Sequence, residues 1–125
     1  MSANTNDRVN RRFKAGWIML LITATLMFLN HAVLIFALEE TVLFVAYTAF
    51  SLYALLVVAI PFRRRETWAW YTSWLFPIGL AAAAAVANDP NIELFYYAVA
   101  AISMLALLAT LPDFFPAGRQ LTRHV

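Results

Sequence analysis

The chain has 125 residues, of which 63% are hydrophobic and only 13% are charged, with a net charge of +2. Soluble domains are about half apolar and about a quarter charged, so this composition excludes an ordinary soluble domain and indicates a membrane protein. The length allows one domain, residues 1–125, and the lack of cysteine excludes disulfides, thiol redox chemistry and cysteine-ligated metals.

Four apolar segments follow one another along the chain, at about residues 16–38, 42–60, 68–87 and 94–111. Each has about the 17 to 25 residues that a helix needs to cross a hydrocarbon core, and none contains Asp, Glu, Lys or Arg. Because backbone groups in lipid must be hydrogen-bonded internally, we expect four helices. The first segment is too long for the apolar part of a signal peptide, so we expect it to be retained. The short connections predict an all-α four-helix transmembrane bundle with up-down-up-down topology.

The basic residues predict the orientation of this bundle. All nine Lys and Arg residues lie before the first segment, between the second and third, or after the fourth, and the other two connections contain none. Under the positive-inside rule both termini face the cytoplasm, which predicts a multi-pass protein of the cell (plasma) membrane. Trp17, Trp68 and Trp70 fall near the inner boundary and Tyr96 and Tyr97 near the outer one, as expected of interfacial anchors. The expected partner is therefore the lipid bilayer and not nucleic acid.

Two polar residues, Asn30 and His31, stand side by side within the first apolar segment. Gly16, Thr23, Asn30 and Ala37 recur every seven residues, and His31 flanks this row, so these residues lie on nearly the same helix face. Small and polar residues concentrate where membrane helices contact each other. We therefore expect this face to point into the bundle.

Polar residues of other segments reach a similar depth. Counting from the outer ends at 1.5 Å per residue places His31 about 10 Å deep, level with Ser51 and Ser103. We therefore predict one polar cluster of Asn30, His31, Ser51 and Ser103, beside Pro77. The fourth segment carries a matching row that should also face the bundle: Tyr96, Ala100, Ser103, Ala106 and Thr110.

Two interpretations of this cluster stay open. A neutral His31 that hydrogen-bonds neighbouring helices has a structural role, at about 0.6 to 2 kcal/mol per bond. Alternatively, an ionisable residue inside the membrane relays protons, binds a polar ligand head or ligates a metal. The only other histidine, His124, lies in the C-terminal tail, and no catalytic, cofactor-binding or metal-binding motif occurs. We accordingly predict no catalytic residues, no cofactor and no metal.

The connection FRRRETWAWYTSW, residues 62–74, is the other distinctive stretch. We expect Arg63, Arg64 and Arg65 to contact anionic lipid headgroups. The motif Arg-Arg-x-Glu-x-Trp-Ala-Trp-Tyr, which ends at Tyr71, resembles a loop found in many small, uncharacterised four-helix integral membrane proteins. The resemblance implies the four-helix layout and brings no activity with it.

The two halves of the chain echo each other. RRFKAGW precedes the first helix and RRRETWAW the third, while ALLVVAIPF ends the second and ALLATLPDF the fourth. This pattern is typical of a duplicated hairpin, as in some transporters. It is equally typical of unrelated helices that leave the membrane on the cytoplasmic side.

For function, we predict a small polytopic membrane protein without enzymatic chemistry, which serves as a structural or accessory component, as a homo-oligomer or in a larger membrane complex. The alternative is a small-molecule or lipid-binding protein or transporter that uses the cluster around His31. A third hypothesis is a membrane enzyme acting on a lipid or isoprenoid, with His31 as acid or base and Glu39 or Glu40 assisting. Hydrogen bonds from both ring nitrogens of His31 to protein favour the structural or accessory role. A cavity that reaches His31 favours the binding protein or transporter.

Overall fold

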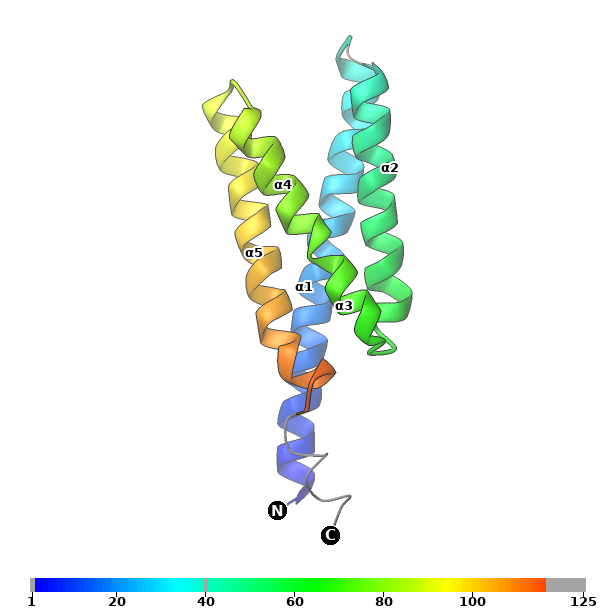
Figure 1. Ribbon diagram of the computed structural model, residues 1–125, viewed down its shortest axis with the longest axis vertical. Helices are drawn as coiled ribbons and strands as arrows, with labels where there is room; N and C mark the ends of the chain where they lie inside the picture. The colour runs from blue at the N-terminus through cyan, green and yellow to red at the C-terminus, as the bar shows by residue number, and fades with distance from the viewer. Residues whose placement is uncertain (1, 40, 117–125) are drawn as a thin grey trace.

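The computed structural model describes residues 2–39 and 41–116, and all regular structure in this part of the chain is helical (Figure 1). Four helical rods in it are long and apolar enough to cross a membrane. This confirms the predicted all-α, four-helix transmembrane fold with an up-down-up-down course. In chain order the elements are α1 (Ser2–Ala37), α2 (Thr41–Val57), η1 (Val58–Phe62), α3 (Thr67–Ser73), α4 (Leu75–Val86) and α5 (Pro90–Phe114).

Two helices begin earlier than the apolar segments that predicted them. α1 starts at Ser2 and not near residue 16, because its polar first part continues the helix beyond the bundle, toward the N-terminus in Figure 1. α5 starts at Pro90 and not near residue 94. The Asp89 side chain accepts a hydrogen bond of 2.8 Å from the Asn91 backbone N–H, and proline suits the first helical position.

Prolines account for the two irregular places in the rods. Pro61 lies inside η1, a π-helical turn that ends the second rod. The third rod is broken at Trp74 into α3 and α4, three residues before the buried Pro77. Pro77 has no N–H to pair with the carbonyl of Ser73, and its ring crowds that carbonyl, so the rod bends where α3 meets α4.

Two helical hairpins, α1–α2 with η1 and α3–α4 with α5, are joined mainly through α1 and α5 (Figure 1). We call the end that carries Arg63, Arg64 and Arg65 the arginine end, and the end that carries Glu39, Asp89 and Glu93 the acidic end. The rings of Phe13, Phe62 and Phe114 cluster at the arginine end, with centroids 4.8 to 6.0 Å apart. The hairpins diverge toward the acidic end (Figure 1).

The divergence explains which predicted faces are buried. On α5 the whole predicted row is buried: Tyr96, Ala100, Ser103, Ala106 and Thr110. On α1 the row starts buried at Gly16 and Thr23, becomes partly buried at Asn30 and is exposed at Ala37. The α1 row therefore contacts other helices only where the hairpins are close.

Each hairpin contains a hydrogen bond from a tryptophan indole to backbone, but the accepting carbonyls do not match in the alignment of the two halves, in which Val58 corresponds to Thr110. The Trp17 indole N–H on α1 donates to the carbonyl of Val58 at 2.8 Å, and the Trp70 indole on α3 donates to the carbonyl of Leu107 at 3.0 Å. In each hairpin, a tryptophan of the first rod thus binds backbone of the second. Ser51 and Ser103 do match in that alignment, and both are buried, while the duplication itself stays a hypothesis.

The contact of α1 with α5 predicts a stability change. A Cβ atom at Gly16 would lie 2.6 Å from Thr110 Cγ2 and 3.2 Å from the carbonyl oxygen of Ala106. Gly16→Ala should therefore lower the free energy of unfolding in a detergent titration by about 1 to 3 kcal/mol, as overpacking does. Thr110→Ser removes the clashing methyl group, so the double variant should regain part of the loss. Equal stability of Gly16→Ala and the wild type would contradict this packing.

Candidate functional site

His31 joins three helices through its two ring nitrogens. Its side chain on α1 is 3% exposed, Nδ1 lies 2.9 Å from the Ser51 hydroxyl on α2, and Nε2 lies 2.9 Å from the Tyr96 hydroxyl on α5. A neutral imidazole has one donor and one acceptor nitrogen, and each hydroxyl can fill either role. All hydrogen-bonding capacity of the ring is thus used within the protein.

The structure brings together only part of the predicted cluster. His31 and Ser51 meet, as expected, but Ser103 lies apart from them. Its hydroxyl donates to the Val99 carbonyl at 2.8 Å and contacts the Thr23 hydroxyl at 3.3 Å. Thr23 precedes His31 by about two helical turns, or about 12 Å along α1. The polar residues therefore form two separate groups at different depths.

Tyr96 takes the place that the sequence analysis gave to Ser103. The depth count began α5 near residue 94, whereas the helix begins at Pro90, so the level of His31 falls at Tyr96. Tyr96 was assigned to the membrane boundary as an anchor. Tyr96 lies on the same helix row as Ser103, and this position is the signal in the sequence that could have identified Tyr96 as the partner of His31.

A cleft opens above this contact, between the two diverging hairpins. A cavity of about 470 Å³ extends from Tyr47 and Tyr96 to the acidic end, and a second of about 200 Å³ reaches His31 itself. Tyr47, Ala83 and Tyr96 line both cavities, which are therefore adjacent, and we call the two together the inter-hairpin cleft. Its walls are mainly apolar side chains: Leu34, Leu38, Leu43, Phe44, Val86, Ile92 and Phe95.

The cleft has three polar side chains that are available to a ligand, Asn30, Tyr47 and, in the first turn of α5, Asn91. Asn30 is partly buried and lines the larger cavity, as does Tyr47, whose ring centre lies 5.4 Å from that of His31. In the part of the chain that the structure describes, neither the Asn30 amide nor the Tyr47 hydroxyl makes a side-chain hydrogen bond, whereas the hydroxyl of Tyr96 is bonded to His31. The floor of the cleft therefore combines satisfied and unsatisfied polar groups.

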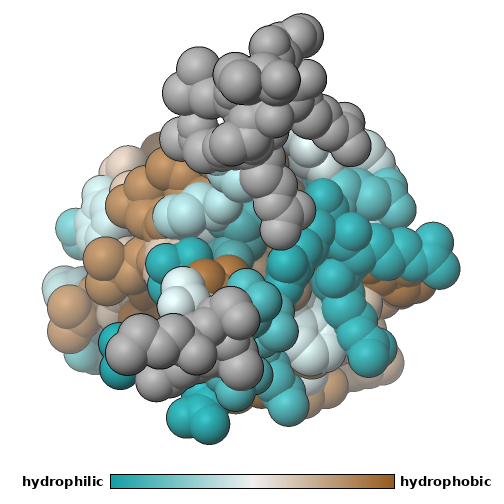
Figure 2. Space-filling model, turned by 90° about the horizontal axis from the view of Figure 1, so that it is seen from below, coloured by the Kyte–Doolittle hydropathy of each residue, from teal (hydrophilic) through white to brown (hydrophobic). Residues whose placement is uncertain are grey.

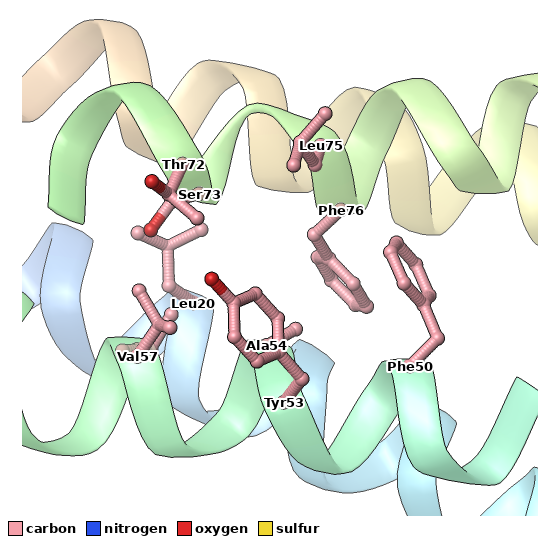
Figure 3. Close-up of a pocket in the computed structure, with 10 residues that line it drawn as sticks. Leu20, Phe50, Tyr53, Ala54, Val57, Thr72, Ser73, Leu75 and Phe76 are labelled. Atoms are coloured by element: carbon pink, nitrogen blue, oxygen red, sulfur yellow. The ribbon is translucent and has the colours of Figure 1, made fainter. Parts of the chain in front are cut away.

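A separate void lies between α2 and the break in the third rod (Figure 3). Its volume is about 10 Å³, which is close to the space that one water molecule needs. Thr72 and Ser73 border it on one side and Tyr53 on the other, as Figure 3 shows. This void is too small for an organic ligand.

Three arginines lie at the opposite end of the molecule from the cleft. Arg65 lies over the Phe13 ring at 4.3 Å and donates to Asn10 at 3.2 Å, and Arg63 lies over the Trp17 ring at 5.4 Å. All three of Arg63, Arg64 and Arg65 are exposed. Figure 2 views this end and shows hydrophilic residues gathered over it. Their charges are available to solvent or to lipid headgroups.

The hypotheses of a metal site and of an acid–base pair concern His31 and the carboxylates of Glu39 and Glu40. Within residues 2–39 and 41–116, no three His, Asp or Glu side chains are grouped closely enough to hold a metal ion. Glu39 is exposed at the acidic end, and the ring of His31 is bonded to hydroxyls and not to a carboxylate. Glu40, the other predicted assistant, lies outside the described residues.

The fold and the cleft define a small polytopic membrane protein with a narrow space between two helical hairpins. Comparison with known proteins found no match to a family model, to a curated protein or to a solved structure. The likeness of the loop that ends at Tyr71 to loops of other four-helix proteins thus remains a resemblance of sequence.

The hydrogen bonds of His31 predict a selective loss of stability. Tyr96→Phe removes the partner of Nε2 and should lower the free energy of unfolding by about 0.6 kcal/mol, and by at most about 1.7 kcal/mol. Tyr97→Phe makes the same chemical change on an exposed ring and should alter stability by only about a few tenths of a kcal/mol. Detergent titration of both variants measures the difference, and equal stability of the two would argue against the bond.

Proposed function

We propose that this protein is a non-enzymatic membrane protein that binds one hydrophobic molecule in the inter-hairpin cleft. The observation that carries the proposal is the pair of adjacent cavities, one reaching the acidic end and the other reaching His31. Small-molecule sites usually measure about 300 to 1,000 Å³ and combine apolar walls with a few polar groups. The larger cavity, of about 470 Å³, lies within this range, and both cavities have mainly apolar walls with a few polar groups.

In this proposal the His31 contact forms the floor of the site. The hydrogen bonds to Ser51 and Tyr96 fix the distance between the hairpins at one depth and leave the cleft open above it. Below this level Ala24 and Met27 are fully buried. Such close packing favours a binding site over a transport path through the bundle.

A structural or accessory role is the second candidate, and the bonding of His31 favours it. Both ring nitrogens are bonded to protein, which is the arrangement expected of a purely structural histidine. Large hydrophobic side chains are exposed along every rod, among them Leu29, Leu56 and Leu105, and these suit either lipid or partner helices in a homo-oligomer or a larger membrane complex. In this role the cleft would hold lipid chains without preference.

Filling the cleft distinguishes the two candidates. Ala83 lines both cavities, whereas its neighbour Ala82 is exposed and lies in neither. Native mass spectrometry of protein released from mild detergent should detect one bound small molecule on the wild type and on Ala82→Phe. In Ala83→Phe the new phenyl ring occupies the cavity, so this variant should lose most of the bound small molecule. Equal occupancy of the two variants, or none on the wild type, would contradict ligand binding in the cleft.

We further propose that the arginine end faces the cytoplasm in the plasma membrane, where Arg63, Arg64 and Arg65 contact anionic headgroups. The support is the positive-inside bias of the sequence, together with the exposure of these side chains.

Because the chain has no cysteine, single cysteines test this orientation directly. A membrane-impermeant maleimide added to intact cells should label Asn88→Cys at the acidic end. It should label Thr67→Cys, at the arginine end, only after the cells are opened. Both positions are exposed and uncharged, so neither substitution alters the charge bias. The reverse labelling pattern would invert the proposed topology.

A further inference from the structure

We infer that the inter-hairpin cleft takes an uncharged ring compound that carries one hydroxyl or carbonyl oxygen, and that Asn30 and Tyr47 bind this oxygen. This inference rests on the proposed function and specifies the chemical class of the ligand. Three features of the cleft carry it: its charge, its free hydrogen-bonding groups and its aromatic walls.

The charge of the cleft excludes anions. Among the described residues, no Asp, Glu, Lys or Arg lines either cavity. The nearest end of the bundle carries Glu39, Asp89 and Glu93, while the described basic side chains all lie toward the other end. An unpaired ion in a low-dielectric site has a large desolvation cost, and the acidic end adds repulsion for an anion. Carboxylates and phosphates are therefore disfavoured, and a cation would find no carboxylate within the cavities.

The hydrogen-bonding groups specify an oxygen on the ligand. His31, Ser51 and Tyr96 already bond to one another. Asn30 offers donors and an acceptor, and Tyr47 offers a hydroxyl. Asn91 offers the same groups as Asn30, but it lies in the first turn of α5, at the acidic end of the cleft. The side chains of Asn30 and Tyr47 are both partly exposed, and a ligand that covers them binds better if it pairs with them, because burying an unpaired polar group is costly. A hydroxyl can pair with both residues, and a carbonyl can accept from both.

The aromatic walls specify a ring. Phe44, Tyr47 and Phe50 from α2 face the cleft opposite Phe95 and Tyr96 from α5. Phe44 and Tyr47 are arranged edge to face, with centroids 6.1 Å apart and an interplanar angle of 77°. A flat ring between the hairpins can make stacked and edge contacts with both sides, which are favoured over random apolar contact.

The five tyrosines of the chain provide natural reporters for a test with three probes. 3-Fluorotyrosine labelling of the full chain in detergent micelles gives fluorine NMR signals, which single Tyr→Phe variants assign. The probes are 2-naphthol, naphthalene and 2-naphthoate, which share one ring system and differ in the polar group. We expect 2-naphthol to shift the signals of Tyr47 and Tyr96 at the lowest concentration. Tyr53, Tyr71 and Tyr97 lie outside the cleft and report probe that merely dissolves in the micelle.

Two variants test the residues that bind the oxygen. Asn30→Leu and Tyr47→Phe should each raise the half-saturating concentration of 2-naphthol, read at Tyr96, about 3- to 10-fold, which is the usual effect of one lost hydrogen bond. Neither change should affect naphthalene. Tyr53→Phe is the matched control, because it removes a hydroxyl from the same helix outside the cleft.

The outcomes separate the inference from the proposed function. If naphthalene or 2-naphthoate binds as well as 2-naphthol, or if both variants bind 2-naphthol unchanged, the ligand class is wrong while binding in the cleft stands. If no probe shifts Tyr47 and Tyr96 more than the other tyrosines, and Ala83→Phe also loses no bound molecule, then both are overturned. Signals of Tyr47 and Tyr96 that shift with protein concentration alone would identify a second copy of the chain as the occupant, which also contradicts the inference.

Discussion

The close approach of α1 and α5 at Gly16 is the constraint on which the rest of the structure depends. The lack of a side chain at Gly16 lets Thr110 and the backbone at Ala106 come within contact distance. In a bilayer, association of helices relies on such packing, because lipid chains are as apolar as the helices themselves. The hairpins are therefore held where their surfaces fit, and they are free to diverge where the fit ends.

His31 lies at the point where this divergence begins. Its bonds to Ser51 and Tyr96 join both hairpins across the edge of the packed region. The His31 ring and its two hydroxyl partners reach across the space between the helices at this depth, where small apolar side chains would leave a gap. The histidine thus closes the packed half and provides the floor of the open half. This position explains how one residue can be buried, fully bonded and adjacent to a cavity at once.

The sequence predicts the spans well because the requirement for them is local. A run of about 20 apolar residues without charge must form a helix in lipid, whatever its neighbours are. Helix ends depend on local chemistry of another kind, such as the Asp89 cap and the polar first part of α1, which hydropathy does not detect. That error of a few residues at Pro90 moved the predicted partner of His31 from Tyr96 to Ser103. The depth of a residue in the membrane, when it is counted from a helix end, therefore carries the full error in the position of that end.

The cleft itself is beyond what a periodic pattern can predict. The seven-residue row on α1 continues to Asn30 and Ala37 as if the helices stayed in contact along their whole length. Their divergence depends on where the hairpins pack closely, at Gly16 against α5 and at Gly79 against Phe50, which is a property of the whole bundle. The pattern places Asn30 in a polar cluster but does not decide whether that cluster is closed or open, and in the structure Asn30 lines an open cavity. A polar residue on an interfacial face therefore has two structural meanings, a helix contact or a ligand contact, and only the distance between the helices decides between them. In this protein that distance is set at Gly16 and His31, so the residues that determine whether a ligand can enter are not those that would touch it.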